Sequence, residues 1–516
     1  MSAWLNKSFF ARNWFLFGCV IIFCIALYFR FTQYYDRLGL ASDQARDALI
    51  AREALRSRSV PLFGPFSSAG NFTTGPIWYW WLILSTALFP HALAAPWIIL
   101  SLSYVGIVLL LVKIGEELEG KLFALIVGLF AAVSPAQIVQ SLNNTNPSLV
   151  ALFATLSLYF AVLYSKHKRL GDLFWATACV ALAIGAHLQA MYLLVFIPFF
   201  LLTTKRKFLL KATGVVVLGL LLPSLPYILA DMQHGFYNLR GIVDFALYGQ
   251  YKIYIPNRWL TYLGVFWPET WGYVIGGFTA IGYMGIFLTV AVVVYTVVKR
   301  KIKGSMGMIL VSFIAIVTML RFYRGERFGG YFVFTHPLVI VLTAWSCFVV
   351  LKVHKYIGIC CIVLLVFGSI YVNYRSIQGA TNISYDRAKY WAELLIHTYP
   401  DRTFTLYITK GTSLSVTLPL VLYLDTEGKI GDTGIKIGFG GIPKYEAGHY
   451  PQIKGNEKDY ALWELESSTS AQLREVGWEN VNPSSIYRNA TQWYKNIHEP
   501  DGLNKLLQLI LSKYYN

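Results

Sequence analysis

The chain has 516 residues, of which 56% are hydrophobic and only 14% are charged, and its mean hydropathy of +0.51 is far above that of a soluble domain. Its net charge of +17 does not indicate a nucleic-acid partner, because Lys and Arg collect in short connectors between apolar runs. The six cysteines all lie within apolar runs, which excludes a disulfide framework in the polar C-terminal region. We therefore expect a polytopic helical protein whose surroundings are a lipid bilayer.

The first apolar run, 14–31, lacks a small-residue cleavage site and ends in Tyr28-Phe29-Arg30-Phe31. We expect it to remain in the membrane and not to be removed as a signal peptide. Placing the basic connectors on the cytoplasmic side predicts eleven crossings, at 14–31, 94–112, 122–140, 147–164, 172–186, 190–204, 212–230, 271–298, 305–321, 331–351 and 356–372. This alternation puts the N-terminus in the cytoplasm and the region after about residue 373 outside the cell membrane.

The apolar segment 76–90 does not fit that alternation. Its 15 residues are short for a span, and counting it as a crossing would move two basic connectors to the external side. We therefore predict an interfacial or re-entrant helix within the first external loop, 32–93. The aromatic residues 78–81 suit the headgroup region, where amphipathic rings are stable.

A second helix is predicted in that loop at 42–57, with Ser42 or Asp43 as its cap and an apolar stripe that includes Ala48 and Leu49.

The region after residue 373 has the composition of a soluble domain. Its helix-like stretches are 384–397 and 469–476, and its strand-like stretches are 403–408 and 460–465. The predicted fold is therefore an all-α polytopic membrane domain, 1–372, followed by a small external α/β domain, 373–516.

Asp43 is the first candidate for catalysis, because an ionisable group at a membrane face is expensive and tends to be functional. A carboxylate there can act as a general base toward an acceptor hydroxyl. The alternative is an N-cap carboxylate, which would stabilise the helix by about 1 kcal/mol. Its polar neighbours Gln44, Arg46 and Asp47 are candidates for substrate binding.

Arginines gather at the tip after the predicted span 305–321, which runs against the positive-inside rule. Because Arg binds phosphate through paired charge-assisted hydrogen bonds, Arg324, Arg327 and Tyr331 are candidates for a lipid-phosphate site. The alternative is snorkelling to headgroups together with a local pair to Glu326.

Two further external tips carry polar side chains. Asn143 and Asn146 offer amides to sugar hydroxyls, although an ordinary helix cap before Pro147 accounts for them as well. His187 and Gln189 are also candidates for substrate binding, although a lone His there is more often a hydrogen-bonded structural residue. No His/Cys/Glu cluster has metal-ligand spacing and no Walker or dinucleotide loop occurs, so we expect no cofactor and assign no metal ligands.

The order of motifs resembles a known family. Asp43-Gln44-Ala45-Arg46, Val60-Pro61-Leu62 and Gly75-Pro76-Ile77-Trp78-Tyr79-Trp80 are similar to the first external loop of family 39 glycosyltransferases, the GT-C fold enzymes akin to protein O-mannosyltransferases and the lipid A aminoarabinose transferase. The resemblance continues with Asn146-Pro147 and with residues 324–331, and covers roughly residues 10–350.

The resemblance implies transfer of a sugar from a polyprenyl- or dolichyl-phosphate donor to an acceptor at the external membrane face. It also implies that Asp43 is the catalytic base and that Arg324, Arg327 and Tyr331 hold the donor phosphate. Two departures matter: the usual Asp-Glu pair is Asp43-Gln44, and the second acid often found near the tip 143–147 is absent. Both weaken the case for a divalent metal, because amides without carboxylates are poor ligands.

The leading hypothesis is therefore an inverting membrane glycosyltransferase that uses a polyprenyl-phosphate sugar donor, with the loop 231–270 closing its pocket. Its acceptor could be a protein, a glycolipid or a polysaccharide. A lipid-linked sugar transporter or flippase is the first alternative, but such carriers need acids near the midplane, and the predicted spans have no Asp or Glu in their central thirds. A non-catalytic membrane scaffold is the second, and Gln44 keeps it open.

Overall fold

The computed structural model describes residues 7–252, 258–302, 304–325, 327–409, 412–431, 433–440, 452–457, 460–465, 470–475 and 477–491. The chain forms two compact units. The helical unit comprises residues 1–34, 66–77 and 99–380, and the sheet unit comprises 35–65, 78–98 and 381–516. Two segments of the first loop thus group with the C-terminal region, which differs from a simple division at residue 373.

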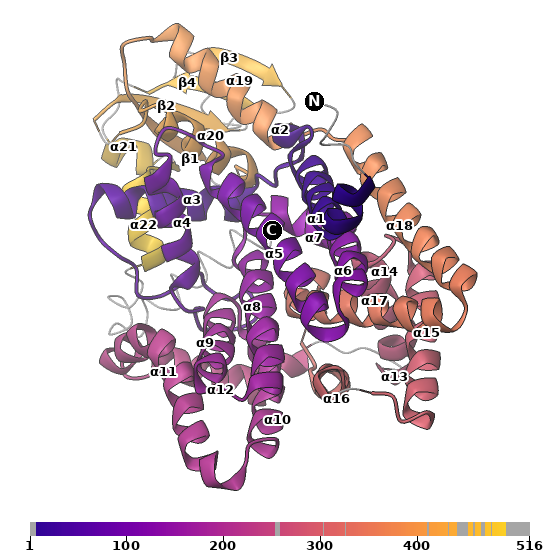
Figure 1. Cartoon of the computed structure of the whole chain (residues 1–516). Helices are drawn as coiled ribbons and strands as arrows, with labels where there is room; N and C mark the ends of the chain where they lie inside the picture. Colours follow the sequence, from indigo (N-terminus) through magenta and orange to yellow (C-terminus); the bar gives the residue numbers. More distant parts are fainter. Residues whose placement is uncertain are drawn as a thin grey trace. The chain divides into compact units, whose positions relative to one another are not determined.

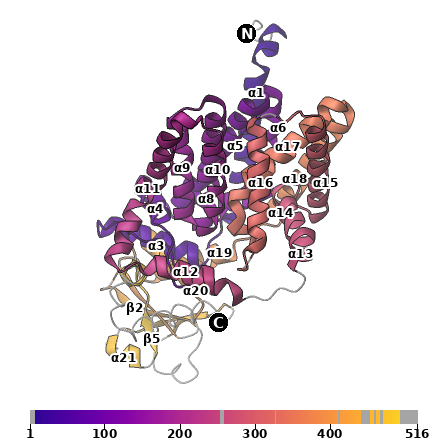
Figure 2. The ribbon, with the colours of Figure 1, turned by 90° about the horizontal axis from the view of Figure 1, so that it is seen from below.

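The helical unit is built from long apolar helices, and Figure 2 shows α5, α8, α9, α16 and α17 lying side by side. Its helices are α1 (Lys7–Phe31), α5 (Ala95–Glu119), α6 (Lys121–Val133), α7 (Pro135–Leu142), α8 (Asn146–His167), α9 (Leu170–Ala186), η2 (Leu188–Val195), α10 (Phe196–Leu202), η3 (Arg206–Phe208), α11 (Leu209–Gln233), α12 (Tyr237–Leu247), η4 (Gly249–Lys252), α13 (Arg258–Thr261), η5 (Tyr262–Phe266), α14 (Trp267–Val274), α15 (Thr279–Val298), α16 (Gly304–Phe322), η6 (Gly329–Thr335), α17 (His336–Val353) and α18 (Lys355–Gln378).

The predicted polytopic helical fold is confirmed. Among the described residues, eight helices are long and apolar enough to cross a membrane, and a ninth is obtained if the bent pair α6–α7 counts as one span. The remaining two predicted crossings correspond to α9 and to η2 with α10, which are shorter apolar helices.

One predicted span begins at the wrong residue. The segment 271–298 is not one helix, because α14 ends at Val274 and α15 begins at Thr279. Gly276 and Gly277 have φ of 88° and 78°, a left-handed conformation that glycine adopts without strain and that ends a helix. The Gly276 N–H donates to Ser369 Oγ at 2.8 Å, so this turn is fixed by α18.

A second predicted span, 122–140, is broken by a bend of 51° between α6 and α7. Pro135 has no N–H to donate, so the last carbonyls of α6 need other partners. Arg30, fully buried in α1, donates to Ala132 O at 3.2 Å and to Ala131 O at 3.5 Å. Asn373 donates to Val133 O at 2.8 Å. The break is thus satisfied by side chains from α1 and α18.

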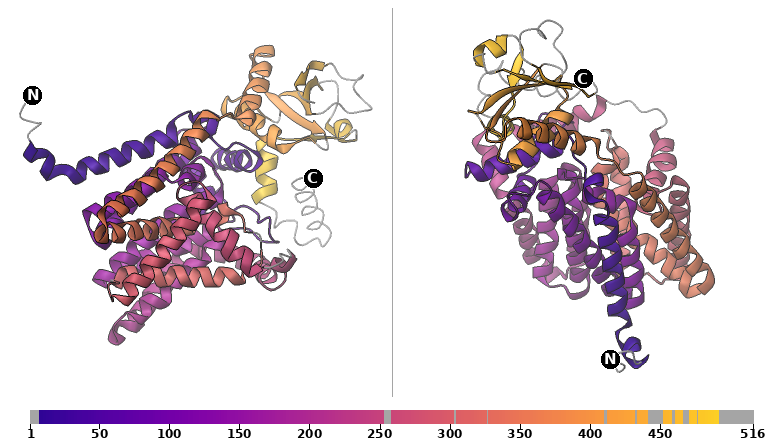
Figure 3. Two further views of the ribbon diagram at one scale, coloured as in Figure 1. Left: turned by 90° about the vertical axis from the view of Figure 1, so that its right-hand side faces the viewer. Right: turned by 90° about the horizontal axis from the view of Figure 1, so that it is seen from above.

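The sheet unit contains a five-stranded sheet in the order β3-β4-β2-β1-β5, shown in Figures 1 and 3. Strands β1 and β2 are parallel, whereas β5, β4 and β3 join them antiparallel. The predicted small α/β domain is confirmed. Its elements are α19 (Ile383–Thr398), β1 (Phe404–Thr409), α20 (Leu414–Thr426), β2 (Ile435–Gly440), β3 (Gln452–Glu457), β4 (Tyr460–Glu464), α21 (Ser470–Glu475), β5 (Trp478–Asn480) and α22 (Pro483–Thr491).

Both faces of this sheet are covered. On one face Phe439 meets Trp391 of α19, with ring centroids 5.7 Å apart. On the other face Tyr407, Trp463 and Trp478 form a buried cluster with Leu473 of α21. Successive strand residues point to opposite faces, so the apolar strands of this region can line two cores at once.

Three helices of the first loop complete the description: α2 (Tyr34–Arg37), α3 (Ser42–Arg56) and α4 (Ile77–Leu88). The helix predicted at 42–57 is confirmed as α3. The expectation that the α4 aromatics lie in the headgroup region was wrong for Trp78 and Tyr79, which are 0% and 1% exposed. Trp78 is buried because its indole N–H has a partner within the sheet unit, described below.

We expect Arg30→Met to destabilise the helical unit, because it leaves the carbonyls of Ala131 and Ala132 buried without donors. Unsatisfied buried groups cost about 1–3 kcal/mol. Thermal unfolding of the purified protein in detergent should show a lower midpoint. Arg169→Met, at an exposed position, is the matched control, and an equal midpoint for both variants would contradict the capping role.

Candidate active site

The start of α3 places Asp43 on a surface. Ala41 occupies the N-cap position, and its N–H donates to Gln44 Oε1 at 3.1 Å. Asp43 is therefore not the cap, and its side chain is 57% exposed. Gln44, where the resembling family has an acid, supplies the side-chain half of the capping box.

Arg46 lies between two carboxylates. Its guanidinium contacts Asp43 Oδ1 at 2.9 Å and Asp47 Oδ1 at 2.7 Å. Asp47 is 2% exposed, and its second oxygen accepts a 2.7 Å hydrogen bond from Trp78 Nε1. Burial raises the pKa of Asp47, while Arg46 and the Trp78 N–H oppose that shift. The two motifs of the first loop thus meet at Asp47 and hold the arginine that pairs with Asp43.

These residues do not fit a divalent-cation site. A divalent ion needs several carboxylate or carbonyl oxygens, and here Asp43 and Asp47 both face one guanidinium. Over the part of the chain that the structure describes, no three His, Cys, Asp or Glu side chains gather as metal ligands.

The segment of the first loop that leads to Gly75 is anchored in the helical unit by Thr73. Asn238 Oδ1 accepts from the Thr73 N–H at 2.7 Å and from its hydroxyl at 3.0 Å, and Tyr227 donates to Thr73 O at 2.9 Å. A Cβ at Gly75 would lie 2.9 Å from Gly185 Cα, so only glycine permits this approach to α9.

Three of the tips predicted from the sequence come together in the helical unit. Asn146 Nδ2 donates to Ala186 O at 2.8 Å. The His187 ring stacks on Tyr331, with centroids 4.9 Å apart, and Gln189 Nε2 donates to the Tyr323 hydroxyl at 3.3 Å. These contacts join the tips at 143–147, 187–189 and 323–331.

Asn143 ends α7 as its C-cap, and its carbonyl accepts from Ser148 Oγ at 2.5 Å. Its side chain remains a candidate for substrate contact.

A fourth segment brings a further cation to this place. Arg258, at the start of α13 in the loop 231–270, donates to Tyr323 O at 2.6 Å. Arg324 follows at once, and its N–H donates to Gln250 Oε1 at 3.0 Å. Arg258, Arg321, Arg324 and Arg327, which we call the arginine cluster, are close enough to repel one another electrostatically.

Aromatic rings lie against two arginines of this cluster. The guanidinium of Arg327 lies 4.6 Å from the Tyr262 ring centroid, and that of Arg321 lies 4.0 Å from the Trp259 centroid. Cation–π contacts of this kind orient a cation without neutralising it.

Three arginines of the cluster have no carboxylate partner among the described residues. Among the described residues, Arg258, Arg321 and Arg327 form no ion pair, and Nε and NH2 of Arg327 are buried without a hydrogen-bond partner. Burial and the nearby Arg258 and Arg321 lower the pKa of Arg327 to about 10. Glu326, the local partner considered above, lies outside the described residues. Buried donors without acceptors are costly, so this cluster is suited to an anion.

His187 adds no charge to this place. Burial lowers the pKa of His187 to about 4, so the imidazole is neutral at physiological pH. It can therefore act as a hydrogen-bonding group beside Tyr331.

Sequence reasoning missed three members of this arrangement. Arg258 and Tyr262 belong to a loop whose residues carry no motif, and Trp78 was assigned to the membrane interface. An arginine in an external loop, contrary to the positive-inside rule, was the available signal for Arg258.

Residues 73–229 match the profile of the family described as dolichyl-phosphate-mannose-protein mannosyltransferase. A comparison with curated proteins gave no match.

Three solved structures are similar to the chain. ArnT from Cupriavidus metallidurans in the apo state is 12% identical, with a TM-score of 0.58 over 88% of this chain and 98% of that one. ArnT from the same organism bound to undecaprenyl phosphate is 12% identical, with a TM-score of 0.59 over 86% and 97%. The Archaeoglobus fulgidus oligosaccharyltransferase in complex with Zn and sulfate is 15% identical, with a TM-score of 0.53 over 78% and 61%.

These likenesses establish the GT-C fold, and the profile match includes the motif at 75–80 and Asn146-Pro147, which are part of the resemblance noted in the sequence. The chain thus has the GT-C fold and carries, across residues 73–229, the sequence signature of the dolichyl-phosphate-mannose-protein mannosyltransferase family.

Proposed function

We propose that the protein transfers a sugar from a polyprenyl-phosphate donor to an acceptor hydroxyl at the external face of the membrane, by an inverting displacement. The observation that carries the proposal lies in the arginine cluster, where Nε and Nη2 of Arg327 are buried without a hydrogen-bond partner among the described residues. The ArnT structure with undecaprenyl phosphate supports a donor of this class.

The arginine cluster would hold the donor phosphate. Nε and NH2 of Arg327 are two donors on one guanidinium, which is the geometry that binds two phosphate oxygens at once. The cluster would also stabilise the charge that grows on the phosphate as the sugar leaves. Tyr331 and Gln189 border this place, and we propose that they and His187 contact the donor.

Asp43 would act as the general base. It takes the proton of the acceptor hydroxyl, the acceptor oxygen forms a bond to the anomeric carbon, and the bond from that carbon to the phosphate oxygen breaks with its electron pair going to the phosphate. Arg46 would keep the Asp43 carboxylate oriented, and Asp47 would keep Arg46 in place. The exposure of Asp43 leaves room for an acceptor.

We propose no direct part in bond breaking for the side-chain amides of Asn143 and Asn146. Asn146 already donates to Ala186, so we propose that it shapes the tip and that Asn143 reaches sugar hydroxyls. We propose no metal or other cofactor for the reaction. The proposed location is the cell membrane, with the N-terminus in the cytoplasm and the sheet unit outside.

We expect Asp43→Asn to abolish transfer, because a general base contributes about 10²–10⁴-fold to the rate. The measurement is release of label from radiolabelled polyprenyl-phosphate sugars by the purified protein. Asp36→Asn, at an exposed acid seven residues earlier, is the control and should retain activity. Release by Asp43→Asn at the rate of the control would rule out the role proposed for Asp43.

We expect Arg327→Gln to weaken binding of undecaprenyl phosphate by about 10–100-fold, because a hydrogen bond to a charged group is worth about 1.5–3 kcal/mol. Binding can be titrated in detergent by the thermal stabilisation that the lipid gives. Arg206→Gln removes an exposed cation and should bind as the wild type does. Equal affinities for both variants would contradict the proposed phosphate site.

We expect cysteines introduced at Lys168 and Ser415, both exposed, to react with impermeant thiol reagents from opposite sides of the membrane. The physical reason is the parity of crossings set by the basic connectors. The native cysteines should first be replaced by serine or alanine. Labelling of both positions from one side would show that the proposed topology is wrong.

A further inference from the structure

The far end of α3 carries a second group of charges, separate from Asp43, Arg46 and Asp47. Arg52, Glu53 and Arg56 lie in its last turns, and their partners come from α20 and α22. Residues four apart share one face of a helix, so Arg52 and Arg56 are presented together. None of these residues belongs to a motif of the first loop.

Asp425, 3% exposed at the end of α20, is the centre of this group. One of its carboxylate oxygens accepts from Arg52 Nε, and the other accepts from Arg56 NH2 at 2.7 Å. Its carbonyl accepts from Arg52 NH2 at 3.1 Å. Arg52 also donates to Pro90 O at 2.8 Å. A single buried carboxylate thus holds two arginines of α3.

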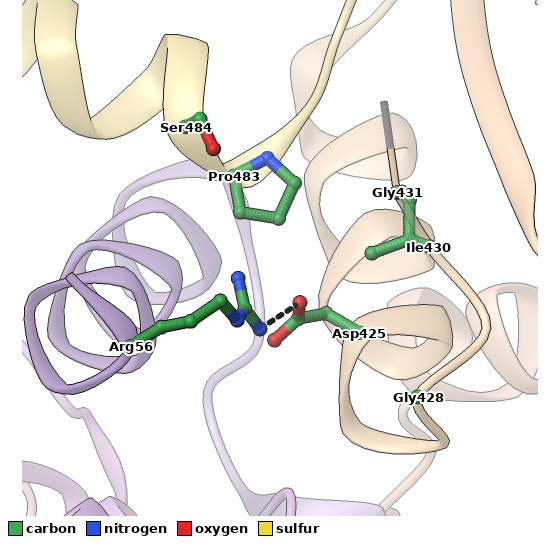
Figure 4. A pocket seen from close by; sticks show the side chains of 7 residues that line it. All are labelled: Arg56, Asp425, Gly428, Ile430, Gly431, Pro483 and Ser484. Atoms are coloured by element: carbon green, nitrogen blue, oxygen red, sulfur yellow. Dashed lines mark hydrogen bonds and ion pairs between the residues drawn. The ribbon is translucent and has the colours of Figure 1, made fainter. Parts of the chain in front are cut away.

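The contacts continue to α22. Arg56 NH1 donates to Glu53 Oε2 at 2.5 Å, and Ser484 Oγ donates to Glu53 Oε1 at 3.0 Å. Figure 4 shows Arg56 and Asp425 joined as an ion pair beside a cavity that Pro483 and Ser484 also line. We call Arg52, Glu53, Arg56, Asp425 and Ser484 the Asp425 junction.

The ion pairs of the Asp425 junction contribute little to the free energy of unfolding. Removing charges from water costs about as much as their attraction returns, and apolar residues of similar size are often as stable or more so. What the charges add is geometry, because the hydrogen bonds of a guanidinium to a carboxylate are directional. The junction therefore fixes the rotation and the position of α3.

We propose that Asp425 is a positioning residue for catalysis, which holds α3 so that Asp43 is placed for proton removal. Arg52 lies nine residues after Asp43 on one uninterrupted helix, about 13.5 Å along its axis at 1.5 Å per residue. A helix of this length transmits a rotation or shift from one end to the other. This inference rests on the proposed function, since it assigns Asp43 the role of base.

The test compares Asp425→Asn with the paired substitution Arg52→Met and Asp425→Leu, which replaces the charges with apolar side chains. A displacement near 1 Å costs about 100-fold in rate, so both forms should lose about 10–100-fold in kcat. Binding of undecaprenyl phosphate, a property of the helical unit, should stay within about twofold of the wild type. Glu393→Gln, which breaks the exposed pair of Lys389 and Glu393, is the control.

Full activity in a stable paired variant would overturn the proposal, because the charges would then be dispensable for placement. A loss of lipid binding in proportion to kcat would overturn it as well, since that would indicate general damage.

Hydrogen exchange separates this inference from the proposed function. Asp425→Asn should speed amide exchange in residues 42–56 but not in α19, where the control substitution lies. One outcome is that the wild type transfers no sugar while amide exchange in α3 is faster in Asp425→Asn. That result would refute the proposed function but would support the conclusion that Asp425 restrains α3. Unchanged exchange in α3 would overturn the hold itself.

Discussion

The structure depends on how the charges and the hydrogen-bond donors of buried arginines find partners. An arginine removed from water must meet acceptors or anions, or its burial is costly. Arg30 donates to the open carbonyls of α6, and the largely buried Arg52 pairs with Asp425. Arg327 meets only aromatic rings in the described chain, with two donors unused. The same physical rule therefore separates arginines whose hydrogen bonds build the fold from Arg327, whose Nε and Nη2 have no hydrogen-bond partner among the described residues.

The helical architecture could be predicted because a membrane span is a local property. About 20 apolar residues suffice to identify one, and each of the eleven predicted runs has a helical counterpart. The breaks within the predicted spans could not be predicted in the same way. Pro135 sits inside an apolar run, and its effect depends on whether Arg30 and Asn373 donate hydrogen bonds to the freed carbonyls. Such compensation arises from distant segments, so local composition does not reveal it.

The site could be predicted in parts. Asp43, Arg324 and Arg327 were named as candidates because charges at a membrane face are rare and the loop motifs resemble a family, and their roles stay predictions. Arg258 and Asp425 were not, because their importance comes from contacts at a distance: Asp425 is separated from Arg52 by 373 positions. The sequence assigned Trp78 to the lipid headgroup region, whereas the residue is buried and its indole N–H donates to Asp47.

The separation between Arg52 and Asp425 also orders events in time. A ribosome makes α3 among the first residues and reaches Asp425 only near the end of the chain. Until then two arginines on α3 lack their carboxylate. A nascent chain, or one truncated before α20, therefore lacks the contacts that Asp425 makes with α3.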